Sequence, residues 1–107
     1  MLKQAGVDCA LAEAGRICGG TTGGTTGKIT VQHGLFCRKL LKEFGPEAAA
    51  LYRQAQEAAL ERYRALCREI DCDFEERDNF IYSANRRDLE EELEALSRTG
   101  APAVLIR

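Results

Sequence analysis

The stretch from Gly15 to Gly34 has the residue types and spacing best suited to binding chemistry. It carries most of the chain's ten glycines, a doubled Gly-Thr-Thr-Gly sequence and the single histidine, His33. Glycine lets the backbone approach a ligand closely, and consecutive peptide N–H groups in such a turn can bind an anion. Threonine hydroxyls add uncharged donors. The pattern indicates a phosphate or cofactor loop, although composition alone slightly favours a flexible linker.

Other chemistries fit the sequence less well. A P-loop needs a glycine, four residues and then Gly-Lys-Ser/Thr, but Thr22 stands at the first position and Ile29 follows Gly27-Lys28. The five cysteines contain no Cys-x-x-Cys, so we interpret them as small, reduced, buried hydrophobes and expect no metal site. A lone histidine beside a glycine does not make a catalytic pair, and we assign no catalytic residue.

Length and charge narrow the classes of protein. The chain has 107 residues and a net charge of −2, with both signs interspersed. Such a charge pattern does not predict a basic surface that would bind nucleic acid or an anionic membrane. No apolar run approaches a spanning helix, and the first residues lack the apolar core of a signal peptide. We expect one small cytoplasmic unit without nucleic-acid or membrane partners.

The residues before the glycine-rich stretch must position it. Residues 1–6 are typical of the end of a helix, and residues 7–12 (VDCALA) predict a short strand buried on both faces, as in a parallel sheet. Glu13 closes this strand. In a dinucleotide-binding βαβ unit, an acidic residue after the second strand holds the ribose hydroxyls, some 20 residues beyond a Gly-x-Gly-x-x-Gly turn. That turn is missing from the sequence, so we expect a chain that begins inside such a unit and is cut from something larger.

The residues after the stretch predict mainly helices. A long helix over 46–70 follows the boundary Gly45-Pro46-Glu47, with Arg53–Glu57 and Glu61–Arg64 pairs on its exposed face. Its apolar stripe is expected to comprise Leu51, Ala55, Ala58, Ala59, Tyr63, Leu66, Cys67 and Ile70. The other predicted elements are an extended piece at 29–32, a helix at 35–44, a hairpin of 73–77 and 79–83, a helix at 86–98 capped by Asn85 and ended by Gly100, and a strand at 103–106.

A family resemblance rests on several motifs taken together. They are Glu13-Ala-Gly-Arg16, Gly20-Thr-Thr-Gly23, Thr25-Thr26-x-Lys28 and Gln32-His33-Gly34-Leu35, in that order. This order resembles the N-terminal part of FAD-dependent oxidoreductases of the D-amino-acid-oxidase-like superfamily, which includes glycine oxidase, sarcosine oxidase and gamma-glutamylputrescine oxidase. Phe44-Gly45, Leu51-Tyr52 and the run from Ile70 to Glu75 are similar to a bacterial subgroup whose members often carry a C-terminal Rieske domain. The resemblance covers nearly the whole chain.

The resemblance implies roles for particular residues. In the family, the residue that matches Glu13 binds the adenosine ribose, and the segment that matches residues 16–28 runs along the FAD pyrophosphate. The resemblance also implies that the substrate domain begins at Asp73. The family transfers hydride from an amine or amino-acid C–H bond to the flavin, which carries the chemistry. The candidate FAD-binding residues are Glu13, Arg16, Gly20, Thr21, Thr22, Thr25, Thr26 and Lys28.

These inferences combine into one expected architecture. The fold class is α/β or α+β and helix-dominated: an incomplete, Rossmann-like FAD-binding portion over residues 1–45, then helix, hairpin, helix and terminal strand over 46–107. Without the pyrophosphate turn and most of the substrate site, we expect a chain that is catalytically silent by itself. The alternative is a stand-alone oligomeric interaction or structural module. Open strand edges and an apolar helix stripe predict a homo-oligomer, preferably a dimer, with the missing remainder of a flavoprotein as the other conceivable partner.

Overall fold

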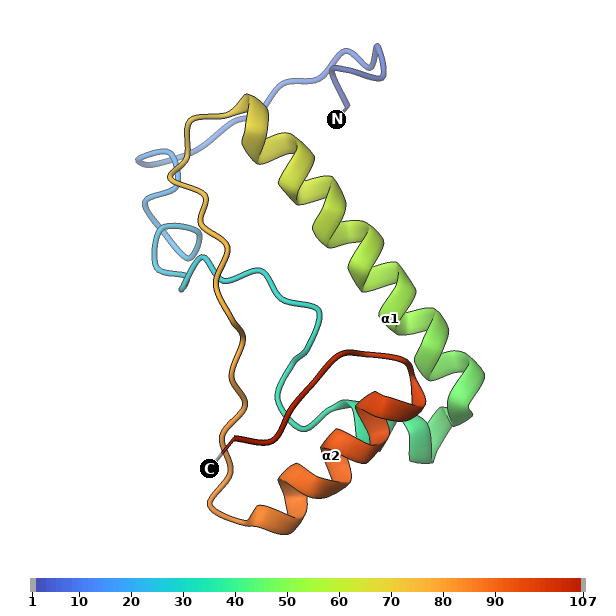
Figure 1. The fold of residues 1–107 in the computed structure, drawn as a ribbon. Coiled ribbons are helices and arrows are strands. Elements are labelled where there is room, and N and C mark those ends of the chain that lie inside the picture. Colours follow the sequence, from blue (N-terminus) through green and yellow to red (C-terminus); the bar gives the residue numbers. More distant parts are fainter. Residues whose placement is uncertain (1, 107) are drawn as a thin grey trace.

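Two helices and long connecting segments make up the fold. The computed structural model describes residues 2–106 and contains α1 (Cys37–Glu69) and α2 (Arg86–Arg98). Figure 1 shows α1 as a long rod with α2 packed across its beginning. The N-terminal segment and the segment that joins the helices run beside the rod as irregular chain.

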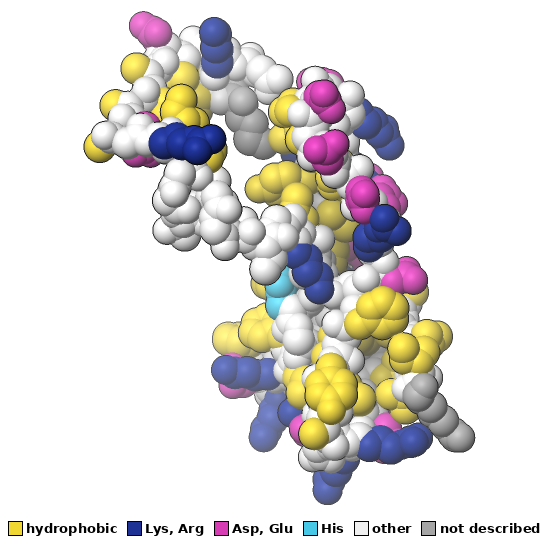
Figure 2. All heavy atoms as spheres, turned by 90° about the vertical axis from the view of Figure 1, so that its left-hand side faces the viewer, with side chains coloured by type: hydrophobic (Ala, Val, Ile, Leu, Met, Phe, Trp, Pro, Cys, Tyr) yellow, Lys and Arg dark blue, Asp and Glu magenta, His cyan; other side chains and the backbone are white. Residues whose placement is uncertain are grey.

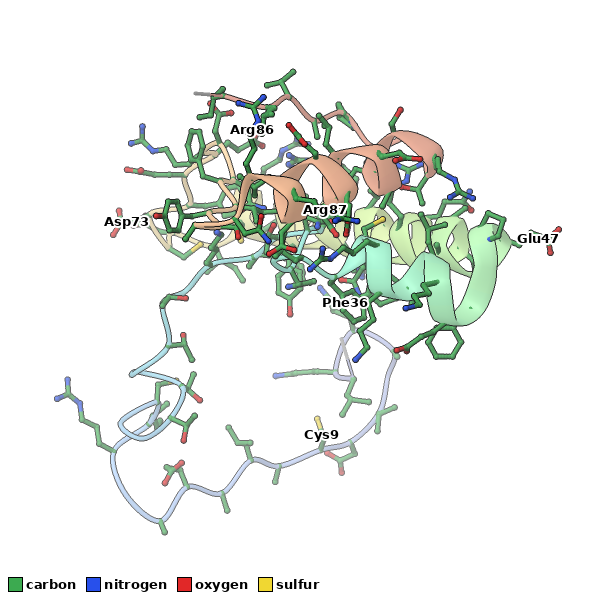
Figure 3. The ribbon with its side chains drawn as sticks, turned by 90° about the horizontal axis from the view of Figure 1, so that it is seen from below. Cys9, Phe36, Glu47, Asp73, Arg86 and Arg87 are labelled. Atoms are coloured by element: carbon green, nitrogen blue, oxygen red, sulfur yellow. The ribbon has the colours of Figure 1, made fainter. Side chains whose placement is uncertain are left out.

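Helix α1 consists of two pieces joined at a kink. Gly45 has φ 80° and ψ 173° inside the helix, and Pro46 follows it. Glycine adopts this backbone conformation at little cost, and proline suits the first position of the second piece. Figure 3 shows Glu47 where the two pieces meet. The boundary predicted at Gly45-Pro46-Glu47 is therefore confirmed, and the long helix expected from residue 46 forms the second piece.

Helix α2 begins and ends where its sequence signals predict. The Asn85 side chain accepts a hydrogen bond of 3.1 Å from the Arg87 N–H. At the other end, Gly100 has φ 76° and its N–H donates to the Ser97 carbonyl at 3.0 Å. An asparagine cap and a left-handed glycine are local features that satisfy backbone groups at helix ends. The prediction of this helix and of its two ends is confirmed.

A buried carboxylate joins the two helices. Glu92 of α2 is 2% exposed and accepts hydrogen bonds from the backbone N–H groups of Cys37 at 2.7 Å and Arg38 at 3.0 Å. These are unpaired donors at the first turn of α1, where the helix dipole favours negative charge. Phe36, the N-cap residue, makes no side-chain cap. Glu92 therefore caps α1 from another helix.

A small apolar core surrounds this contact. Cys37, Ala95 and Leu96 are buried together, and Leu41 and Ala101 pack against them. Beside the core, the Arg38 guanidinium makes ion pairs of 2.9 Å with both Asp88 and Glu91. The polar contacts and the core hold the start of α1 against α2.

The predicted sheet elements are wrong. Within residues 2–106 the structure contains no strand, so neither the Rossmann-like α/β portion nor the β-hairpin forms. Residues 7–12 and the segments 73–83 and 103–106 are irregular or extended chain without a ladder. Residues 2–6 form turns closed by the Gly6 N–H to Lys3 carbonyl bond rather than a helix end, and Met1 of that prediction lies outside the described residues.

The missing sheet has a physical explanation. A strand is stabilised by hydrogen bonds and side-chain pairs across to a neighbour, and an isolated hairpin is marginal in water. Residues 7–12 are exposed with no neighbouring strand in the described chain. In the expected hairpin, Phe80 and Tyr82 are 68% and 88% exposed, and Asp73 has φ 50°, which interrupts an extended run. The apolar alternation is present, but no second surface covers it.

The orientation of α1 also differs from the prediction. The Arg53–Glu57 and Glu61–Arg64 ion pairs form as expected, yet Arg53 and Arg64 lie on the half-buried face. The predicted apolar stripe faces outward instead, with Leu51 67%, Tyr63 50% and Ile70 57% exposed. Figure 1 shows α2 against the beginning of α1. The less exposed positions of the rod include apolar Ala49 and Tyr52 as well as Arg53 and Arg64. The expected exposure of the face with the ion pairs is therefore wrong for Arg53 and Arg64.

The molecule is open for its length. Its accessible surface is 9094 Å², whereas a compact monomer of this size would expose roughly 5,900 Å². Its radius of gyration is 17.6 Å, compared with about 13 Å for a compact domain of about 100 residues. Much apolar surface is therefore left uncovered. No helix in the described chain is both long enough and apolar enough to cross a membrane.

Candidate functional site

A groove brings the end of the glycine-rich stretch against the segment that precedes α2. Its volume is about 390 Å³, and its lining residues are Thr26, Lys28, Thr30, Gln32, His33, Gly34, Asn79, Phe80, Ile81 and Tyr82. Figure 2 shows the glycine- and threonine-rich loop as a mostly uncharged surface above a hydrophobic cluster. The groove is the place in the described chain where predicted cofactor residues meet a distant segment.

Gln32 fixes one wall of this groove. Its Nε2 donates to the Glu92 carboxylate at 2.5 Å and to the Gly34 carbonyl at 2.7 Å. The backbone carbonyl of Gln32 accepts a 3.2 Å hydrogen bond from Asn79 Nδ2. This bond joins Gln32 to the segment that forms the opposite wall of the groove. Thr30 holds the Gln32 backbone through its hydroxyl. The groove is therefore linked to the carboxylate that caps α1.

The groove offers cationic, hydrogen-bonding and aromatic groups together. Lys28 supplies a positive charge and Thr26 a hydroxyl, while Phe80 and Tyr82 present exposed rings on the other wall. A cation beside stacking surfaces suits an anionic ligand that carries a planar ring. Nothing in this set supplies a paired nucleophile and base.

The predicted FAD-binding residues fall into two groups. Thr26 and Lys28 line the groove. The other six, which are Glu13, Arg16, Gly20, Thr21, Thr22 and Thr25, lie in exposed chain outside it. The Glu13 carboxylate accepts a 2.9 Å bond from the N–H of Gly15, two residues away. The FAD-binding role of all eight stays a prediction.

The glycine-rich loop bonds mainly to itself. The Gly24 N–H donates to the carbonyls of Gly20 and Thr21 at 3.3 and 3.1 Å, and the Thr25 hydroxyl accepts from the Gly27 N–H at 3.2 Å. A Cβ on Gly23 would lie 2.3 Å from the Cys18 carbonyl oxygen. Glycine is thus required at residue 23 for a close approach within the loop. These N–H groups are turned toward the chain rather than toward a phosphate.

The arrangement does not fit FAD as it stands. A bound cofactor is normally enclosed over most of its surface, but the candidate residues up to Thr25 are exposed. Two of the eight candidate residues line the groove and the other six lie outside it, so the eight do not form one binding site. The groove alone could accept only a part of such a ligand.

The cysteines and acidic residues form no metal cluster in the described chain. Within residues 2–106, no three histidine, cysteine, aspartate or glutamate side chains are grouped to hold an ion. All five cysteines are free, and Cys37 alone is buried. The interpretation of the cysteines as buried hydrophobes is therefore right for Cys37 and wrong for the exposed Cys9, Cys18 and Cys72.

Comparison with known proteins gives the family. A sequence model described as FAD dependent oxidoreductase (DAO) matches residues 1–107. The chain belongs to this family. The resemblance read from Glu13, the Gly-Thr-Thr-Gly repeat and the Gln32-His33-Gly34 motif is confirmed at the level of the family.

A longer bacterial protein is similar to the chain. It is named as the putative Rieske 2Fe-2S iron-sulfur protein YhfW of Bacillus subtilis (strain 168), and it is 32% identical over 111 residues. The match covers 99% of this chain, and the chain spans 22% of the length of that relative. No solved structure gave a significant match.

Gln32, Asn79 and Glu92 are site residues that sequence reasoning missed. Gln32 stood within a quoted motif, but its partners lie 47 and 60 residues further along the chain. Glu92 reads as one more carboxylate in an acidic helix. No local pattern distinguishes it, because its function as a cap arises only when α2 crosses α1.

Proposed function

We propose that the chain forms the N-terminal, cofactor-side portion of an FAD-dependent oxidoreductase that acts on amine or amino-acid C–H bonds. The family match over the whole chain carries this proposal. The groove supports it, because Lys28 and Thr26 lie opposite aromatic side chains where an anionic, ring-bearing ligand could rest. The Bacillus relative is named for a Rieske 2Fe-2S cluster. We therefore also propose that the oxidoreductase to which this chain belongs works together with a 2Fe-2S group.

We also propose that the chain is catalytically silent by itself. The eight candidate residues do not enclose a cofactor, and the loop that carries most of them bonds to its own backbone. Binding FAD would require the loop to open and a second wall to cover it. The ordering of this exposed loop opposes such binding in the isolated chain.

A turnover assay tests the silent state. The purified chain is mixed with FAD and with a panel of amino acids and of primary and secondary amines, and anaerobic bleaching of the flavin absorbance is followed. We expect no bleaching above that of FAD without protein. Amine-dependent bleaching that scales with protein concentration would refute the proposal, and a full-length family oxidase serves as positive control.

The alternative function, an oligomeric interaction module, is favoured by the outward apolar face of α1. We define this apolar face as Leu51, Ala55, Ala58, Ala59, Tyr63 and Ile70. When the chain is studied by itself, a second copy is the occupant that we propose for it, because its alanines allow another helix to approach closely. A standard interface covers about 800 Å² on each partner, which the excess exposed surface readily supplies.

A further inference from the structure

Two thiols share a cavity at the end of α1. Cys67 lies in the last turn of the helix and Cys72 lies three residues beyond its end at Glu69. Both line a cavity of about 370 Å³, together with Arg64, Arg68, Ile70, Asp71, Asp73, Phe74 and Glu76. This cavity is separate from the groove that contains Lys28.

The backbone around this cavity is arranged to hold the two thiols close. Helix α1 ends in an extended Ile70, and Asp73 adopts φ 50°, so the chain reverses just after Cys72. The Arg64 guanidinium then binds the returning Glu76 carboxylate at 2.8 Å. That ion pair closes a turn whose two sides carry Cys67 and Cys72. Figure 3 shows Asp73 at the end of the molecule opposite Glu47.

The two thiols differ in accessibility. Cys72 is exposed, whereas Cys67 is half-buried. Loss of hydration raises the pKa of Cys67, and the neighbouring Cys72 thiol raises that pKa further through a side-chain hydrogen bond. The negative end of the α1 dipole acts in the same direction. Cys72 is therefore the thiol that reacts first with a reagent in solution, and Cys67 is the neighbouring thiol that can react in a second step.

We propose that Cys67 and Cys72 form a reversible dithiol–disulfide site that reacts with low-molecular-weight disulfides such as glutathione disulfide. The Cys72 thiolate attacks one sulfur of the reagent, which releases one glutathione thiolate and leaves a mixed disulfide on Cys72. The Cys67 thiol then loses its proton and attacks the Cys72 sulfur, which releases the second glutathione. The chain loses two electrons and two protons, and one glutathione disulfide becomes two glutathione molecules.

The proposed disulfide has a structural consequence. It fixes the turn that leads from α1 toward Phe80 and Tyr82, which line the groove. The remaining cysteines are placed differently: Cys37 is buried against α2, and Cys9 lies on the N-terminal segment away from both helices, as Figure 3 shows. The Cys67–Cys72 pairing should therefore form in preference to other pairings.

Peptide mapping tests the site directly. The chain is treated with glutathione disulfide, blocked with iodoacetamide and digested with trypsin without reduction. Cleavage after Arg64, Arg68 and Arg77 separates the two cysteines into peptides 65–68 and 69–77. We expect these two peptides to be recovered joined by one disulfide, and to separate after reduction.

Variants keep the assay decisive. Cys67→Ser should leave glutathione attached to Cys72, because no second thiol is left to displace it. Cys9→Ser should give the same joined peptides as the unmodified chain. The proposal is overturned if the unmodified chain keeps glutathione on Cys72, or if Cys72 pairs as often with Cys9 or Cys18 as with Cys67.

Discussion

At the scale of single residues, Glu92 is the side chain on which the described fold depends most. It is almost fully buried, and it accepts hydrogen bonds from two backbone N–H groups of α1 and from the Gln32 side chain. Hydrogen bonds to a charged group stabilise a protein by about 1.5–3 kcal/mol each, and removal leaves buried donors unpaired. The cap on α1 and the wall of the groove therefore share one carboxylate.

Replacing Glu92 should destabilise the chain and loosen the groove. We expect Glu92→Ala to lower the free energy of unfolding by about 2–3 kcal/mol, measured by urea denaturation with circular dichroism at 222 nm. Glu92→Gln, which keeps one acceptor oxygen, should cost less. Glu94→Ala, on the exposed face of the same helix, is the control and should stay within about 0.5 kcal/mol. Equal effects of Glu92→Ala and Glu94→Ala would contradict the assigned cap.

The stability of the chain should depend on pH through Glu91, which is paired with Arg87 and Arg38. Hydrogen bonds from Arg87 first, and from Arg38 next, hold the pKa of Glu91 below its ordinary value of 4.5. Because the folded-state pKa is depressed, the stabilisation is complete above 4.5 and is lost as the pH falls through the lowered folded-state pKa. The urea midpoints of the unmodified chain and Glu91→Gln should differ at neutral pH and converge in acid. A constant difference at all pH values would exclude this origin.

At the scale of elements, local signals predicted the two helices correctly, whereas the predicted strands do not form in the described chain. Asn85, Gly100 and the Gly45-Pro46 step act on neighbouring backbone groups, so their effect is readable from a few residues. Strands require a partner elsewhere in the chain, and the alternation of Phe80, Ile81 and Tyr82 cannot show whether one is present. The same limit applies to α1, where the face with Arg53 and Arg64 was expected to be exposed and is half-buried.

The kink in α1 should depend on glycine at residue 45. Open space surrounds the position where a Cβ would stand, so the cost of Gly45→Ala is conformational only. A residue with a Cβ at φ 80° and ψ 173° is strained by about 1–3 kcal/mol. We expect that loss in urea denaturation, with Gly20→Ala as a control in open space without a positive φ. If Gly45→Ala left the stability unchanged, the kink would not require glycine at residue 45.

At the scale of the whole molecule, the open surface is the dominant feature. The apolar face of α1 and the exposed aromatic residues near the groove lack a cover in the described chain. Family membership was readable from the sequence because it rests on the order of short motifs. The convergence of Thr26 and Lys28 with Asn79 was not readable, because it depends on how the long segments fold back.

The isolated chain should self-associate through the apolar face of α1. Light scattering coupled to size-exclusion chromatography should give a mass of at least two chains at micromolar concentration. Ala58→Glu, which places a charge within the apolar face, should shift the chain toward the monomer, whereas Gln54→Glu adds the same charge on the exposed surface beside that face and should not. A monomeric unmodified chain would contradict the proposed occupant.

This chain belongs to an FAD-dependent family, and we propose that it does not bind the cofactor by itself. Titration of FAD with the purified chain, followed by flavin fluorescence and by equilibrium dialysis, tests it most directly. We predict no saturable change at micromolar protein, and no difference between the unmodified chain and Lys28→Ala. Saturable binding of one FAD per chain, weakened by Lys28→Ala, would contradict the account.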